Sequence, residues 1–330
     1  MKEGRHLLTL LASVASLQLA ALSSGVAHAQ TWPAKPLRVV VPYAAGGATD
    51  TVARAMGQRL SDQIGQPVVV DNRGGGGAVI GTEVVAKSAP DGYTVLLAVG
   101  PPHNTFPLFA RAMPFDSVRD FTPVAILATL PQVLAVNASI PVKSLRELIE
   151  YGRSHPGKLS YGTTGVGSSQ HLGGEMLNAK AGIDMVHVAY KGGAPLLTDL
   201  LGGQIPVGVL VLSNVLPHVK TGKLQALAVI EAHRADASPE TPTVAEAGLP
   251  GFAVPSTWIG VLGPAGLPAA IVSRLQSELA AATVAPEVRS KLEAAGFQVK
   301  VSSSREFAEQ LSASVEVYRG IVGAARITLE

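Results

Sequence analysis

Two glycine-rich segments of this 330-residue chain combine groups that suit anion binding. Residues 44–50 and residues 163–169 each follow an apolar run and precede a helical pattern. Glycine lets the backbone approach a ligand closely, and the first N–H groups of a helix have no partner within it. The positive end of the helix dipole adds attraction for an anion. Two such loops facing one another would hold a carboxylate without arginine. The residues alone leave open that both are ordinary strand–helix turns.

Catalytic and metal-binding patterns are weak. Ser168 and Ser169 precede His171 closely, so an exported serine hydrolase stays an alternative, although no Gly-x-Ser-x-Gly motif surrounds them. A histidine that packs at a helix start is the simpler interpretation of His171. The histidines show no metal-ligand spacing, and the chain has no cysteine. We therefore expect no enzyme activity, no metal and no cofactor, and we interpret Asp50 as a helix cap rather than a general base.

Strands and helices alternate along the chain and position both glycine-rich segments. Apolar and β-branched runs predict strands at 37–43, 68–70, 93–99, 159–161, 185–190, 207–212 and 224–230. Four-residue apolar spacing predicts helices after residue 49 and after residue 169, and a short one at 196–201. The alternation favours an α/β protein with mostly parallel sheets flanked by helices. In such sheets, ligands bind at the carboxyl ends of the strands, where both loops fall.

The last third of the chain predicts three helices, at about 268–283, 286–295 and 304–321. Helices of this length need a sheet to pack on. The earliest strands are the natural candidate, so we expect the chain to return to its first domain.

Composition and the N-terminus narrow the class further. Hydrophobic residues make up 47% and charged residues only 15%, the reverse of a disordered protein, and a net charge of +2 gives no case for nucleic acid. Lys2 and Arg5 precede an apolar run, and Ala27-His28-Ala29 offers small residues for cleavage. This is the pattern of a signal peptide over residues 1–29, so we expect export to the periplasm after cleavage near Ala29.

Ordered motifs run through nearly the whole mature chain. They occupy residues 32–50, 65–73, 90–94, 157–162, 187–192, 222–229, 242–251 and 263–266. The first reads WPAKPLRVVVPYAAGGATD, and the seventh reads PTVAEAGLPG. In content and order, these motifs resemble the periplasmic substrate-binding receptors of tripartite tricarboxylate transporters, the Bordetella-uptake-gene (Bug) receptor family.

The resemblance implies a two-lobed Venus-flytrap fold of type II-like architecture. Lobe 1 would combine residues 31–123 and 253–330, lobe 2 would span residues 124–252, and strands near 121–128 and 252–260 would act as hinges. It also implies that a ligand carboxylate is held between the loops, partly through ordered waters. The ligand-binding residues that it implies are Tyr43, Ala45, Gly46, Gly47, Thr49, Asp50, His103, Asn104, Thr164, Gly165, Gly167, Ser168, Ser169, Tyr190, Lys191 and Val211.

Val211 departs from the family pattern. Family members often carry an acidic or amide residue near this place, where it contacts the distal group of the ligand, whereas this chain has an apolar residue. We therefore expect a ligand with a less polar distal part, such as an aromatic or monocarboxylic acid, rather than aspartate. The resemblance implies a monomer that captures a small organic acid and transiently contacts the integral membrane subunits of a tripartite transporter. A ligand-sensing subunit of a signalling system uses the same cleft and stays an alternative.

Overall fold

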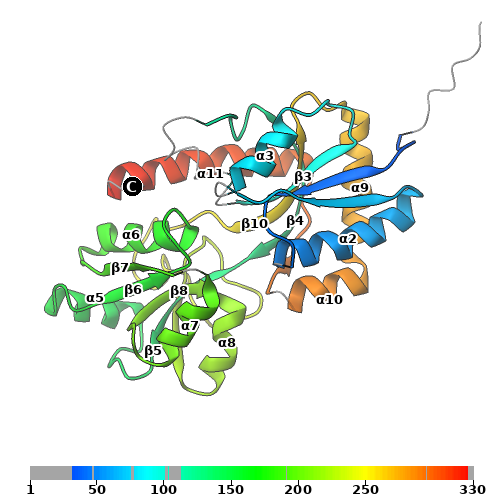
Figure 1. Ribbon diagram of the computed structural model, residues 1–330. Coiled ribbons are helices and arrows are strands. Elements are labelled where there is room, and N and C mark those ends of the chain that lie inside the picture. The colour runs from blue at the N-terminus through cyan, green and yellow to red at the C-terminus, as the bar shows by residue number, and fades with distance from the viewer. Residues whose placement is uncertain are drawn as a thin grey trace, which may run out of the picture. The chain divides into compact units, whose positions relative to one another are not determined.

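The computed structural model consists of α-helices that alternate with β-strands (Figure 1). It describes residues 32–46, 48–75, 78–100, 103, 113–190, 192–294 and 296–325. The expected signal peptide, residues 1–29, lies outside these ranges. Within them, no helix is long and apolar enough to cross a membrane.

Six strands form the first sheet. They are β1 (Leu37–Val41), β2 (Val68–Asn72), β3 (Thr94–Val99), β4 (Phe121–Leu130), β10 (Thr257–Pro264) and β11 (Gln298–Val299). Their order is β11-β4-β10-β3-β1-β2. Strands β2, β1 and β3 are parallel, whereas β10 runs antiparallel to both β3 and β4.

Five strands form the second sheet. They are β5 (Gln132–Asn137), β6 (Ser160–Thr163), β7 (Val186–Ala189), β8 (Val207–Val211) and β9 (Leu224–Val229), in the order β7-β6-β8-β5-β9. The parallel strands here are β7, β6 and β8, and β5 runs antiparallel to its neighbours β8 and β9. The second sheet thus repeats the arrangement of the first, with one antiparallel strand beside a parallel trio.

The predicted α/β fold with helix-flanked sheets is confirmed, and most strands of each sheet run in one direction, but both sheets are mixed. The reason lies in how the chain crosses between them. Strand β5 enters the second sheet directly from β4, and β10 enters the first sheet after the chain leaves β9. Each enters at the edge where the parallel strands end, as the pairs Gln132↔Val211 and Ile259↔Val99 show, so each must run antiparallel to them.

Helices cover both sheets. Those of the first are α2 (Ala48–Ile64), α3 (Val79–Ala86), α9 (Ala269–Val284), α10 (Pro286–Ala294) and α11 (Ser304–Ala325). Those of the second are α5 (Leu145–Ser154), α6 (Ser169–Ala181), α7 (Gly193–Leu201) and α8 (Leu212–Lys220). Helices α9 and α11 pack on β4, and α10 packs on α2. The predicted return of the C-terminal helices to the first sheet is therefore confirmed.

Helix α11 also contacts α6, beside the second sheet. Phe307 and Leu311 join the core of the first sheet, whereas Tyr318 and Ile321 join a core of the second. Figure 1 shows α11 reaching α6, in agreement with the contacts between these two helices.

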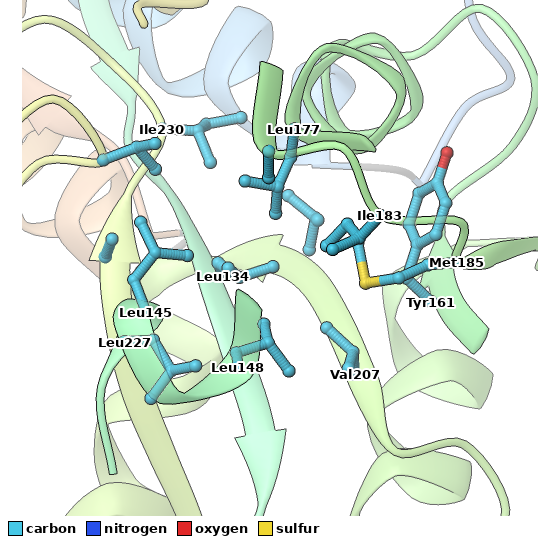
Figure 2. Close-up of a cluster of buried hydrophobic side chains, with 14 of the residues drawn as sticks. Leu134, Leu145, Leu148, Tyr161, Leu177, Ile183, Met185, Val207, Leu227 and Ile230 are labelled. Carbon is cyan, nitrogen blue, oxygen red and sulfur yellow. The ribbon is translucent and has the colours of Figure 1, made fainter. Parts of the chain in front are cut away.

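The core of the second sheet follows the two-residue period of a strand. Leu134 and Val136 of β5 face the cluster that contains α5 and α6 residues, while Val133 and Ala135 face the cluster that contains α7 and α8 residues. Figure 2 shows part of the first cluster, with Leu134 among side chains from α5, α6 and neighbouring strands. Full burial of each such aliphatic side chain contributes about 1.5–3 kcal/mol. This packing holds β6, and therefore the loop after it, in place.

Candidate ligand-binding site

The two glycine-rich loops follow β1 and β6, at the carboxyl ends of parallel strands. The chain crosses between the sheets at Pro131, between β4 and β5, and again at residues 255–256, before β10. Leu130 pairs with Thr257, and Gln132 pairs with Val211, so both crossings adjoin the carboxyl ends of parallel strands. The topology therefore sets both loops at the sheet edges that adjoin the crossings. This is where open α/β sheets bind ligands.

The first loop is held by Asp50, which lies in the first turn of α2 and is 3% exposed. Its Oδ2 accepts the N–H of Gly46 at 2.9 Å and Nε of Arg54 at 3.0 Å. The hydrogen bonds from Arg54 and Gly46 lower the pKa of this carboxyl. Gly46 has a φ of 86°, in the left-handed region that favours glycine. Asp50 thus holds the loop from within the first turn of α2, rather than as the cap residue that the sequence suggested, and its charge is engaged by Arg54.

Asn72 connects the same network to Tyr43. Arg54 Nη2 donates to Asn72 Oδ1 at 3.1 Å, and Asn72 Nδ2 donates to the carbonyl oxygen of Tyr43 at 3.2 Å. Burial raises the pKa of the Tyr43 hydroxyl, which therefore stays a neutral donor. The sequence did not identify Arg54 or Asn72 as supports of the loop, although Asn72 lies in one of the ordered motifs.

The second loop is closed by its own hydroxyl groups. Ser168 is the N-cap of α6: its Oγ accepts the N–H of His171 at 3.2 Å and donates to the carbonyl oxygen of Gly165 at 2.7 Å. Gly165 and Gly167 have φ values of 135° and 79°, so both positions require glycine. The N–H groups of the first turn of α6 have no acceptor within the helix and are therefore candidates to bind an anion.

Two histidines bond residues of this loop and hold it in place. His171 Nδ1 accepts the N–H of Gly167 at 3.2 Å, and His187 Nε2 lies 2.7 Å from Thr163 Oγ1. The two rings are stacked, and burial lowers the pKa of each to about 4, so both are neutral at pH 7. His171 is thus engaged by the backbone of the loop. The sequence offered no signal that His187 would be its partner.

The serine hydroxyls beside His171 have other partners. Ser169 Oγ lies 3.1 Å from Thr257 Oγ1, and Ser168 Oγ bonds the backbone. Among the described residues, neither hydroxyl forms the hydrogen bond to an imidazole nitrogen that a serine nucleophile needs. The described residues also contain no group of three or more His, Asp or Glu that could hold a metal.

The remaining predicted residues lie in different surroundings. His103 is 4% exposed, donates from Nε2 to the carbonyl oxygen of Ser117 at 2.9 Å, and packs edge-on against Phe121. Burial lowers its pKa to about 4. The structure thus gives His103 a place in the aromatic core of the first sheet, which favours a packing role over ligand contact.

Tyr190 and Val211 flank the second loop. The Tyr190 N–H donates to the carbonyl oxygen of Thr163 at 3.0 Å, and its hydroxyl donates to Asp199 at 2.9 Å. Val211 ends β8 beside Gln132 and is half-buried. Ala45 is exposed, and Thr49 is half-buried in the first turn of α2. Gly47, Asn104 and Lys191 lie outside the described residues. That these side chains contact a ligand stays a prediction.

Known proteins resemble this chain over nearly its whole length. The profile of the tripartite tricarboxylate transporter family receptor, TctC, matches residues 52–325. Protein BugT of Bordetella pertussis (strain Tohama I) is 34% identical over 299 residues, covering 89% of this chain and 90% of BugT.

Two solved structures were determined with an organic acid. R. palustris Rpa4515 with adipate is 35% identical, has a TM-score of 0.74, and is matched over 90% of this chain and 99% of that chain. MatC (Rpa3494) from Rhodopseudomonas palustris with bound malate is 31% identical, has a TM-score of 0.70, and is matched over 88% of this chain and 100% of that chain. These likenesses identify the two helix-flanked sheets as a two-lobed α/β binding-protein fold. The chain belongs to the tripartite tricarboxylate transporter receptor family.

Proposed function

We propose that this protein is a periplasmic receptor that captures a small organic carboxylate between its two glycine-rich loops. The position of the two loops is the main support for this proposal. Both loops lie at sheet edges that adjoin the same crossings, and each loop precedes the start of a helix. Membership of the receptor family supports the same reading, as do the adipate and malate named with two relatives. The protein performs no catalytic step.

Backbone N–H groups and hydroxyls carry the recognition in this proposal. Arg54 is engaged by Asp50 and Asn72, so it serves the first loop rather than the ligand. In lobe 1 (residues 31–123 and 253–330) the loop around Gly46 meets the ligand, and in lobe 2 (residues 124–252) the loop around Gly165 does. Ligand binding shifts an equilibrium between open and closed forms. The closed monomer then transiently contacts the membrane subunits of its transporter.

Val211 sets the class of ligand. It ends β8 beside the crossing at Pro131, where an apolar side chain neither balances an ammonium group nor donates to a second carboxylate. The receptor therefore prefers acids whose distal part is apolar, such as aromatic or monocarboxylic acids, over aspartate. Adipate also has an apolar middle but carries a distal carboxylate. Its binding therefore shows whether the receptor selects for an apolar chain or against a charge at the distal end.

Titration of the mature protein with benzoate, hexanoate, adipate, malate and aspartate tests both proposals. A ligand at one hundred times its dissociation constant raises the unfolding free energy by about 2.7 kcal/mol, which a thermal-shift assay detects. Stabilisation by benzoate or hexanoate, with none by aspartate, supports the assignment. Tight binding of aspartate with no binding of apolar acids contradicts the ligand class, and no shift with any acid contradicts the receptor function.

A charge placed at Val211 gives a sharper test. Val211→Asp is expected to abolish the preference for benzoate or hexanoate, because the distal pocket then carries a carboxylate. Val69→Asp is the matched control, since Val69 is 51% exposed on β2, at the edge of the first sheet. If both variants bind the acids like the natural protein, Val211 does not line the ligand site.

A further inference from the structure

Two buried glutamine side chains join the second loop to the first crossing. Gln170, in the first turn of α6, and Gln132, at the start of β5, are only 4% and 2% exposed. Gln170 Oε1 accepts the N–H of Thr164 at 2.9 Å and also its hydroxyl. Gln170 Nε2 donates to Gln132 Oε1 at 2.7 Å, and Gln132 Nε2 donates to the carbonyl oxygen of Leu130 at 3.0 Å. The result is an unbroken row of hydrogen bonds from the loop to the last residue of β4.

The orientation of both amides is determined by the backbone at the two ends of the row. The N–H of Thr164 can only donate, so Gln170 must present its oxygen to it. The carbonyl of Leu130 can only accept, so Gln132 must present its nitrogen. The bond between the two glutamines then has one possible direction. Neither amide can turn over alone without leaving buried polar groups unpaired.

Gln132 is itself held at the crossing by its backbone. Its N–H donates to both carboxyl oxygens of Glu231, at 3.0 and 3.2 Å, and Glu231 follows β9 in the chain. Ser169, next to Gln170, lies 3.1 Å from Thr257, the first residue of β10. The start of α6 therefore forms hydrogen bonds to residues at both crossings between the sheets. Gln132 directly follows Pro131, where the chain would bend if the sheets moved relative to one another.

We propose that Gln132 and Gln170 are positioning residues that couple the second ligand loop to the hinge between the two sheets. The inference rests on the proposed function, because it takes the loop at Thr164 as part of the ligand site. Neither glutamine side chain needs to touch the ligand. Together they hold Thr164, and with it the start of α6, in one geometry relative to Leu130. A change at either end of the row alters the hydrogen bonds at the other end, because breaking one bond of a buried, fully paired polar network leaves further polar groups without partners.

Hydrogen exchange of the Thr164 amide tests this coupling without any ligand. Gln132→Leu removes the donor to Leu130 and the acceptor for Gln170, although it lies two hydrogen bonds from Thr164. We expect exchange at Thr164 to accelerate about two- to tenfold, the equivalent of one lost hydrogen bond of roughly 0.5–1.5 kcal/mol. Gln132→Asn gives the same direction of change with a milder perturbation, because its side chain is one methylene too short to reach both partners.

Asn178→Leu is the matched control in the same helix. Asn178 also makes two side-chain hydrogen bonds, to the backbone of Met185, and none to the loop or the crossing. The Asn178→Leu variant should have a lower overall stability, but hydrogen exchange of the Thr164 amide should stay unchanged relative to that of the neighbouring amides. If exchange at Thr164 stays within twofold of the natural protein in both Gln132 variants, or rises equally in Asn178→Leu, the coupling is wrong.

Ligand titration extends the test to function. Gln132→Leu and Gln170→Leu are each expected to weaken binding of the best acid from the panel above by about two- to tenfold. The double variant should bind the acid no more weakly than the single variant with the larger loss, because both changes interrupt the same row of hydrogen bonds. Losses that multiply contradict the coupling. If the natural protein binds no acid while Gln132→Leu still accelerates exchange at Thr164, the receptor function fails and the coupling within the protein stands.

Discussion

The imidazole rings of His171 and His187 are stacked with their centroids 4.0 Å apart, directly behind the second loop. One accepts the N–H of Gly167 and the other contacts the hydroxyl of Thr163. Two charged rings at this distance would repel each other, and burial disfavours even one charge. The loop therefore depends on two neutral histidines, and this makes it sensitive to acid.

The first prediction is a loss of stability on acidification. The pKa of each ring is lowered from 6.5 to about 4 in the folded state, so the unfolded chain binds more protons between these values. The free energy of unfolding should fall as the pH drops from 6.5 through 4. His171→Asn keeps an acceptor for the Gly167 N–H but removes one titrating ring, so urea unfolding at pH 7, 6, 5 and 4.5 should show a shallower decline.

His171→Phe separates the two roles of this ring. It removes the acceptor as well as the titrating group, so it should be less stable than His171→Asn at every pH, by about 1–3 kcal/mol, because the Gly167 N–H loses this acceptor. A pH profile of His171→Asn as steep as that of the natural protein would show that the ring does not titrate as the structure implies.

The second prediction concerns a glycine that lets β6 pack against α6. A Cβ atom at Gly174 would overlap Cε2 of Tyr161, a fully buried ring whose hydroxyl bonds Glu175. Gly174→Ala should destabilise the protein by about 1–3 kcal/mol through overpacking. Gly320→Ala in α11, where no side chain of the described residues lies within 4 Å of the new Cβ, should instead stabilise it by up to about 1 kcal/mol. Thermal unfolding of both variants measures the contrast, and equal effects would contradict it.

Much of the fold could be predicted from local pattern alone. The C-terminal helices were expected at 268–283, 286–295 and 304–321 and lie at Ala269–Val284, Pro286–Ala294 and Ser304–Ala325. Helix α8 was missed because Val211 both ends β8 and caps the helix, with no polar cap or turn residue to mark the change. Helix α5 was missed although its start carries a signal, a Ser144 side chain that accepts the N–H of Glu147.

The site was predictable only where its signals are local. Glycines at positive φ and Asp50 lie within a few residues of the groups they hold, so the sequence revealed both loops. The supports of the second loop come from distant parts of the chain. His187 is 24 residues from Thr163, Gln132 is 38 residues from Gln170, and Glu231 is 99 residues from Gln132. Such pairs depend on how the strands are ordered, and mixed sheets were not predicted.

The third prediction tests the anchor of the first loop. Asp50→Ala removes the acceptor of the Gly46 N–H and the partner of Arg54. Charge-assisted hydrogen bonds of this kind contribute about 1.5–3 kcal/mol, so we expect ligand affinity to fall about tenfold or more as the loop loosens. Asp62→Ala is the control on the same helix, because among the described residues the exposed Asp62 side chain bonds Gln58 alone. Titration with the best acid should leave the Asp62 variant unchanged. Equal losses in the two variants would mean that Asp50 acts through α2 and not through the loop.

The fourth prediction concerns the carboxyl group at the crossing. Burial raises the pKa of Glu231 from 4.5 to about 8, although the Gln132 N–H partly offsets this. The folded state therefore holds a proton that the unfolded chain has lost. The stability that this group contributes is complete below pH 4.5 and is lost as the pH rises through about 8, with a slope of at most about 1.4 kcal/mol per pH unit.

Glu231→Gln keeps an acceptor for Gln132 and carries no charge. In urea unfolding, its free energy of unfolding should therefore rise relative to that of the natural protein as the pH is raised from 5 to 9. Glu309→Gln, on the exposed face of α11, controls for the loss of one acidic group. If the Glu231 and Glu309 variants show the same pH profile, Glu231 is ionised in the folded protein, and the bond to Gln132 is then one between an amide and a buried charge.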